Sequence, residues 1–101
     1  MYIIDLNKAV LNRPKFKARN PDYKEGKPCV YVGSTCIGIE ERFKQHKDGY
    51  KSNRYAKKYG KRLRYNDMKV IRPRKTRISI EKKESEVAKD LQSKSWAVWW
   101  G

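Results

Sequence analysis

Two short segments carry the apolar, strand-forming residues of a small sheet. Residues 2–6 read YIIDL and residues 29–33 read CVYVG, and both are rich in β-branched and aromatic side chains. Alternation along the second segment places Tyr31 on the face opposite its two valine neighbours. We expect the segments to pair antiparallel, because the entropic cost of closing the connection between them grows slowly with its length.

The connection itself, at about residues 7–28, is predicted to be a long basic loop. Its composition shifts to Pro, Lys, Arg, Asn and Gly, and turn signals occur at Asn20-Pro21 and at Glu25-Gly26. Segments of this composition usually run over the protein surface between regular elements.

Helical periodicity appears in three later segments. The first begins at Ile39 and ends at Gly49, and the second is short, with Asn53 as its predicted N-cap. The third covers residues 80–93, with Ser79 as its N-cap.

The remaining apolar residues predict a third strand around residues 68–71 and a short extended tail at residues 96–100. A chain of 101 residues suits one domain, over residues 1–101. We therefore expect an α+β fold in which a small antiparallel three-stranded sheet is flanked by helices.

The charge of the chain indicates a polyanionic partner. There are 26 Lys and Arg against 11 Asp and Glu, which gives a net charge of +15. Residues 42–77 alone hold 15 basic and 2 acidic residues, interleaved with Tyr50, Tyr55, Tyr59 and Tyr65. Basic side chains suit phosphate contacts and aromatic rings stack on bases or sugars, so we expect this stripe to bind nucleic acid.

The residues expected to contact nucleic acid share this stripe: Lys44, Lys47, Lys51, Asn53, Arg54, Lys57, Lys58, Lys61 and Arg62. The alternatives for the stripe are a solvated surface that keeps the protein soluble, or a surface that binds acidic membrane or RNA. DNA is the expected partner, and charge alone does not exclude RNA. The sequence predicts no particular oligomeric state.

The cysteines and the apolar runs favour a reduced, cytoplasmic protein. Cys29 and Cys36 have no CxxC spacing and no histidine at zinc-ligand spacing, so we expect buried small residues and no sulfur-bound metal. We also expect neither a signal peptide nor a membrane span, because the apolar runs are too short.

Three positions on the predicted helices could carry chemistry. Arg42 and His46 lie one turn apart, where a guanidinium can hold a phosphate and an imidazole can donate a hydrogen bond or shuttle a proton. The alternative is a surface arginine beside a half-buried histidine. Glu84 falls within the apolar arc formed by Val87 and Leu91, where a carboxylate needs a metal ion or an arginine as its partner. The alternative is a solvated first-turn glutamate favoured by the helix dipole.

In sequence order, Tyr2, the YVGST segment at residues 31–35, Arg42, His46 and Glu84 resemble the GIY-YIG nuclease family. Taken singly, the two tyrosines would more often be packing residues. The first motif departs from the family pattern because Tyr2 follows a methionine and its initial glycine is absent. No convincing equivalent of the late asparagine found in many relatives is present.

The resemblance implies a role for each matched residue. Tyr2 and Tyr31 would be the motif tyrosines, one of which orients or deprotonates the attacking water. Arg42 would neutralise the scissile phosphate, and His46 matches a histidine of restriction and homing branches. Glu84 would be the single metal-binding carboxylate, with Mg²⁺ as the expected cation and Mn²⁺ as the alternative.

We therefore expect a metal-dependent endonuclease that hydrolyses DNA phosphodiester bonds. One alternative is a non-catalytic nucleic-acid-binding module that uses the basic stripe at residues 42–77. Another is a basic structural protein in which Arg42 and Glu84 pair across two helices.

Overall fold

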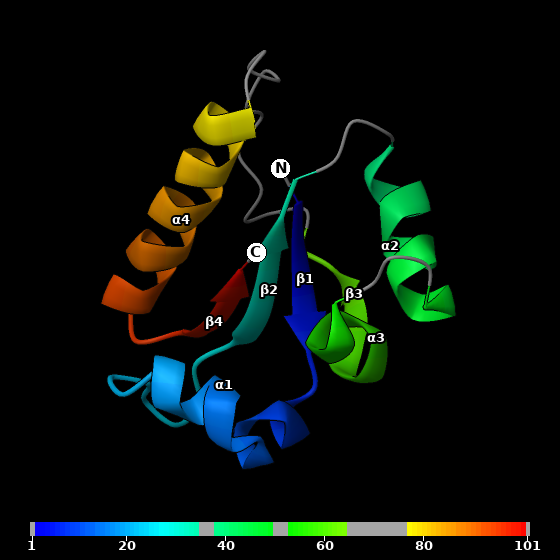
Figure 1. The fold of residues 1–101 in the computed structure, drawn as a ribbon. Helices are drawn as coiled ribbons and strands as arrows, with labels where there is room; N and C mark the ends of the chain where they lie inside the picture. The colour runs from blue at the N-terminus through cyan, green and yellow to red at the C-terminus, as the bar shows by residue number, and fades with distance from the viewer. Residues whose placement is uncertain (1, 35–37, 50–52, 65–76, 101) are drawn as a thin grey trace.

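A computed structural model describes residues 2–34, 38–49, 53–64 and 77–100, with the side chains of the last segment described from residue 82 onward. A four-stranded sheet forms its centre, in the order β3-β1-β2-β4 (Figure 1). The strands are β1 (Tyr2–Leu6), β2 (Cys29–Gly33), β3 (Gly60–Leu63) and β4 (Ala97–Trp100). β1 pairs antiparallel with both β2 and β3, whereas β4 pairs parallel with β2.

The α+β class is confirmed, but the prediction of three antiparallel strands is wrong in number and direction. The predicted extended tail forms β4, whose Ala97 pairs with Cys29 and whose Trp99 pairs with Tyr31. β3 was not predicted, because a segment reading GKRL has no apolar alternation and only Leu63 packs on the core. The strand predicted at residues 68–71 lies outside the described residues.

The connection predicted as a loop contains two short helical elements. They are the 3₁₀ helix η1 (Lys8–Asn12), capped by the Asn7 side chain, and helix α1 (Pro14–Arg19), which has Pro14 at its first turn. Val10 and Phe16 are fully buried. The prediction of a loop at residues 7–28 is thus wrong over the part where single apolar residues anchor helical turns.

The three predicted helices are present as α2 (Ile39–Asp48), α3 (Arg54–Tyr59) and α4 (Arg77–Ser93). α2 ends at Gly49, which adopts the left-handed conformation with φ 88° that glycine tolerates. Asn53 caps α3, because its side-chain oxygen accepts the backbone N–H groups of Tyr55 and Ala56. α4 begins at Arg77, so Ser79 lies inside the helix and is not its cap.

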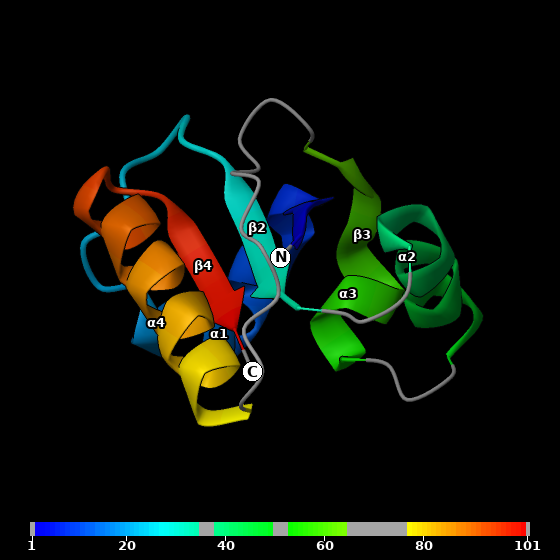
Figure 2. The same ribbon diagram turned by 90° about the horizontal axis from the view of Figure 1, so that it is seen from above.

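The sheet is covered on both faces. Tyr2, Ile4 and Tyr31 lie on the face that packs against η1, α1, α2 and α3. Ile3 and Val30 lie on the opposite face, which packs against α4. Figure 1 shows α4 on one side of the sheet and α2 with α3 on the other, and Figure 2 shows the same order from above.

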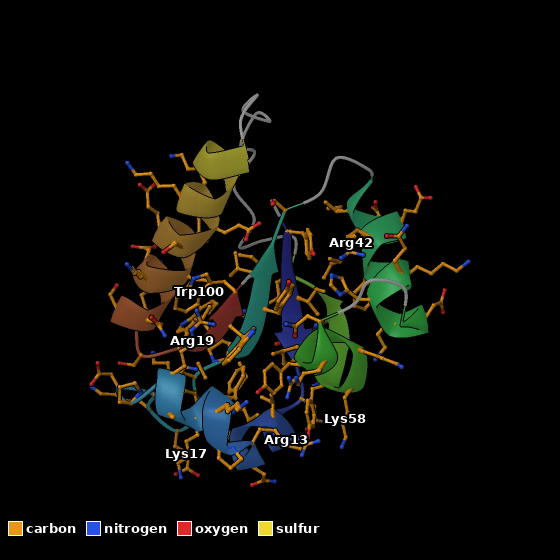
Figure 3. All side chains as sticks on the ribbon, in the orientation of Figure 1. Arg13, Lys17, Arg19, Arg42, Lys58 and Trp100 are labelled. Carbon is orange, nitrogen blue, oxygen red and sulfur yellow. The ribbon has the colours of Figure 1, made fainter. Side chains whose placement is uncertain are left out.

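The free edge of β4 is closed by side chains from the end of α1. The buried Asn20 amide accepts from the Val98 backbone N–H at 2.7 Å and donates to the Val98 carbonyl at 3.1 Å, as a neighbouring strand would. Arg19 donates to the Trp100 carbonyl at 3.2 Å and stacks over the Trp99 and Trp100 rings (Figure 3). This cover satisfies backbone groups that an edge strand leaves unpaired.

No helix in the described residues is long and apolar enough to span a membrane. Cys29 is a buried free thiol, as predicted, and Cys36 lies outside the described residues.

Candidate active site

The five candidate residues come from four elements that meet at one end of the sheet. β1 begins where β2 ends, because the strands are antiparallel and Tyr2 pairs with Gly33. Arg42 on α2 is level with this end in Figure 3. Glu84 lies on α4, which covers the opposite face of the sheet. Helices from the two faces therefore supply a cation and an anion to the same end of the sheet.

His46 connects Tyr2 to the start of α3 through two hydrogen bonds. Its Nε2 lies 2.7 Å from the Tyr2 hydroxyl, and its Nδ1 accepts the Asn53 backbone N–H at 3.2 Å. A backbone N–H can only donate, so Nδ1 carries no proton. In the neutral imidazole the proton is then on Nε2, which donates to the Tyr2 oxygen.

The imidazole is neutral at physiological pH. His46 is completely buried, and burial lowers its pKa from 6.5 to about 4, with the nearby positive charge of Arg42 acting in the same direction. The half-buried histidine considered from the sequence is therefore a buried hydrogen-bond donor to Tyr2. Its role is to hold a phenol in place.

The two phenols keep their protons at neutral pH. Burial raises the pKa of Tyr2 and of Tyr31, and the charge of Glu84 raises both further. The positive charge of Arg42 opposes these shifts. Glu84 and Arg42 thus act electrostatically on the same pair of hydroxyl groups, although their helices lie on opposite faces of the sheet.

Gly33 is required by the close approach of Tyr2. A Cβ atom added at Gly33 would lie 2.4 Å from the Tyr2 hydroxyl oxygen and 2.5 Å from the ring carbon that bears it. Tyr2 is buried and bonded to His46, so its ring cannot move without breaking that bond. The missing side chain at this position therefore fixes where the phenol lies.

Glu84 is nearly buried, with 9% of its surface exposed, and its Oε1 accepts a hydrogen bond from the Ser34 hydroxyl. Ser34 directly follows β2, so this bond ties α4 to the end of the strand. The described residues contain no group of three His, Cys, Asp or Glu side chains that could hold a metal ion. A single carboxylate suits one hard cation that retains most of its water ligands, as Mg²⁺ does.

Arg42 is half-buried, and its Nη1 donates to the Gln45 side chain at 3.0 Å. Its positive charge influences the pKa of Tyr2, Tyr31 and His46. Arg42 also makes a side-chain hydrogen bond with Tyr2. A guanidinium has five N–H donors in a planar fork, which is the geometry that binds phosphate oxygens in pairs.

The predicted nucleic-acid contacts divide into two groups. Seven are exposed in the described part of the chain: Lys44, Lys47, Arg54, Lys57, Lys58, Lys61 and Arg62. Lys47 also donates to the carbonyls of Lys57 and Gly60, whereas Asn53 is half-buried and caps α3. Lys51 lies outside the described residues.

Tyr55 was expected to stack on nucleic acid, and this prediction is wrong. The ring is buried and packs edge-on against Phe16 and Trp99. Tyr59 is half-buried, and Tyr50 and Tyr65 lie outside the described residues.

Two contributors to the site were not predicted from the sequence. Ser34 was noted only as part of the YVGST motif, and its bond to Glu84 joins residues fifty positions apart. Asn53 was predicted as a cap and as a nucleic-acid contact, but its backbone N–H also fixes the His46 tautomer. Only the motif itself could have drawn attention to Ser34, since hydroxyl residues are common at strand ends.

The comparison with known families agrees with this geometry. The model of the GIY-YIG catalytic domain matches residues 23–96, which is most of the chain. The chain belongs to the GIY-YIG nuclease family. Tyr31, Arg42, His46 and Glu84 lie within the matched residues of this GIY-YIG domain, whereas Tyr2 precedes them and is placed by its bond to His46. Neither a curated protein nor a solved structure shows significant similarity to the chain.

Proposed function

We propose that this GIY-YIG domain is a divalent-metal-dependent endonuclease that hydrolyses phosphodiester bonds in DNA. The observation that carries the proposal is that one end of the sheet holds Tyr2, which is hydrogen-bonded to His46 and Arg42, and Glu84, which is hydrogen-bonded to Ser34 at the end of β2. Phosphodiester hydrolysis needs a positioned water molecule, positive charge on the phosphate oxygens and stabilisation of the leaving oxyanion. Residues with chemistry suited to each of these tasks lie around one end of the sheet.

Glu84 is the residue that would hold the cation. Its Oε1 accepts from Ser34, and its second oxygen, which has no hydrogen bond or ion pair to any described residue, would be the ligand. A divalent cation there would stabilise negative charge on the phosphate and on the leaving oxygen. Mg²⁺ is the expected ion and Mn²⁺ the alternative, since both accept carboxylate and water oxygens.

The two phenols would position the attacking water, and the guanidinium would bind the phosphate. Tyr2 and Tyr31 hold the attacking water by hydrogen bonds, because their raised pKa values keep both hydroxyls protonated at neutral pH. His46 fixes the Tyr2 oxygen through Nε2–H. Arg42 binds the non-bridging phosphate oxygens, where negative charge increases in the transition state.

DNA is proposed as the substrate on charge and on the family's nuclease character. The exposed basic residues of α2, α3 and β3 would contact its phosphates. We also propose that the protein acts in the cytoplasm, where its buried Cys29 would remain reduced.

The proposal is tested by incubating purified protein with supercoiled plasmid, with and without Mg²⁺. We expect nicked or linear DNA with Mg²⁺ and no conversion when EDTA is added. A non-catalytic binding module would retard the plasmid equally in both conditions and leave it intact, which would contradict the proposal. A parallel reaction on single-stranded RNA of matched length tests the choice of substrate, and preferred cleavage of RNA would overturn it.

A further inference from the structure

A second basic surface lies at the end of the molecule away from Arg42. Figure 3 shows Arg13, Lys17 and Lys58 along this end, where η1 packs against both α1 and α3. All three side chains are exposed. We call this the α1–α3 surface, defined by Arg13, Lys17 and Lys58.

The charge around this surface is of one sign. Residues 7–21 contain five Lys and Arg and no acidic residue, and residues 42–64 contain ten Lys and Arg with Asp48 as the one acidic residue. Within the part of the chain that the structure describes, no carboxylate forms an ion pair with Arg13, Lys17 or Lys58. The surface is therefore not neutralised by those residues.

Two of these cations lie next to the same aromatic ring. The Arg13 guanidinium lies 6.0 Å and the Lys58 ammonium 5.6 Å from the centre of the Tyr59 ring. Attraction to the ring is weak for an exposed cation. Two like charges next to one ring repel each other, and an external polyanion relieves that repulsion.

We infer that the α1–α3 surface binds phosphates of the same DNA duplex that the catalytic end cleaves. This inference rests on the proposed function for the identity of the polyanion. The described molecule is 36 Å along its longest axis, so about ten base pairs of duplex would extend from end to end. Arg54, Lys57 and Lys58 are exposed on α3, which lies beside both η1 and α2.

The surface uses a part of the chain that the GIY-YIG family model does not cover. Arg13 and Lys17 precede the matched residues, which begin at residue 23. η1 and α1 pack on the core through the buried residues Val10 and Phe16, so they hold these cations on a fixed scaffold. The segment inserted between the two tyrosine motifs thereby contributes to DNA affinity through phosphate contacts that are distant from the cleaved bond.

Binding to a fluorescent 25-base-pair duplex tests the inference, with every protein in a Glu84→Gln background so that no DNA is cut. The test variant is Arg13→Gln with Lys58→Gln, and the control is Lys89→Gln with Lys94→Gln, which removes the same charge from the α4 side of the sheet. We expect the test variant to bind roughly tenfold more weakly near 0.1 M salt, and the slope of log affinity against log salt to fall by about 1.8. The control should retain both values.

Equal weakening by the two variants would overturn the inference, because net charge alone would then account for binding. No weakening by either would overturn it as well. If the Arg13 and Lys58 substitutions reduce binding to anionic lipid vesicles or duplex RNA more than to DNA, the surface serves another polyanion and the inference also fails.

Cleavage by the protein with Glu84 intact is measured separately, so a protein that binds DNA at this surface without cutting it contradicts only the proposed function. Circular dichroism of each variant confirms folding.

Discussion

At the scale of single residues, the site depends on how one buried histidine is held. His46 accepts from the Asn53 backbone N–H at Nδ1 and donates to Tyr2 from Nε2, and the bond at Nδ1 requires the neutral ring. Protonation at Nδ1 would place an N–H against the Asn53 N–H and break the first bond. The position of Tyr2 is therefore linked to the protonation state of His46.

This linkage predicts a pH dependence of stability. The pKa of His46 is about 4 in the folded protein and near 6.5 when the chain unfolds, so the unfolded state binds more protons between these values. Above pH 6.5, His46 gives the free energy of unfolding no pH dependence. As the pH falls from 6.5 to 4, protonation of His46 in the unfolded chain lowers this free energy by up to about 1.4 kcal/mol per pH unit. Urea unfolding near pH 7 and pH 5 measures the decrease. Carboxylates also titrate in this range, so the matched comparison is His46→Gln, which should lose less stability on acidification. Identical losses in the two proteins would show that His46 is not buried in its neutral form.

Residue patterns selected the candidate site residues but did not predict how they are positioned. Glu84 was recognisable as a carboxylate within an apolar helical arc, and the structure confirms that it is nearly buried. Alternation assigned each of Tyr2 and Tyr31 to a face of its own strand, and in the structure both lie on the sheet face toward α2. The bonds from Ser34 to Glu84 and from Asn53 to His46 could not be predicted, because each depends on tertiary contacts between separate elements.

At the scale of elements, the segment between β1 and β2 does more than connect them. Asn20 binds the backbone of β4 and accepts a hydrogen bond from the Gln92 side chain on α4 at 2.9 Å. One buried amide thus joins α1, β4 and α4. From the sequence this asparagine was a turn signal, and its partners on β4 and α4 lie more than seventy positions away.

We predict that Asn20→Ala lowers the free energy of unfolding by about 2–4 kcal/mol, because it leaves buried backbone groups of Val98 without partners. Asn12→Ala is the matched control, since Asn12 is exposed at the end of η1 and its loss should change stability by less than about 0.5 kcal/mol. Chemical denaturation of both variants measures the difference. A similar small effect in both would mean that the amide bonds contribute little to closing the sheet edge.

The elements themselves were predictable to different degrees. Caps and periodicity identified α2, α3 and α4, because Asn53 and Gly49 act locally. β4 was read as an extended tail, and its parallel pairing with β2 was not foreseen. Pairing of strands distant in sequence is decided by the packing of α4 and by the Asn20 amide, neither of which has a local signal.

At the scale of the whole molecule, the fold places the candidate site at one end of the sheet and basic residues at the other. The two faces of the sheet bring α2 and α4 to one end, and the basic residues of α1 and α3 extend over the other. Net charge of +15 raises the affinity of the chain for any polyanion. Binding alone therefore does not distinguish a nuclease from a basic binding protein, and a test must address the carboxylate.

The most direct test compares cleavage of supercoiled DNA in Mg²⁺ by the natural protein, Glu84→Gln and Glu86→Gln. Glu86 is exposed on the same helix, so its substitution makes the same change of charge away from the sheet. We expect Glu84→Gln to reduce the cleavage rate by at least about a hundredfold, the scale of losing a group that stabilises charge in a transition state, and to leave DNA affinity nearly unchanged. Glu86→Gln should cleave at the natural rate. Cleavage by Glu84→Gln at the rate of the Glu86 control would contradict the assignment of Glu84 as the metal-binding residue and, with it, the proposed mechanism.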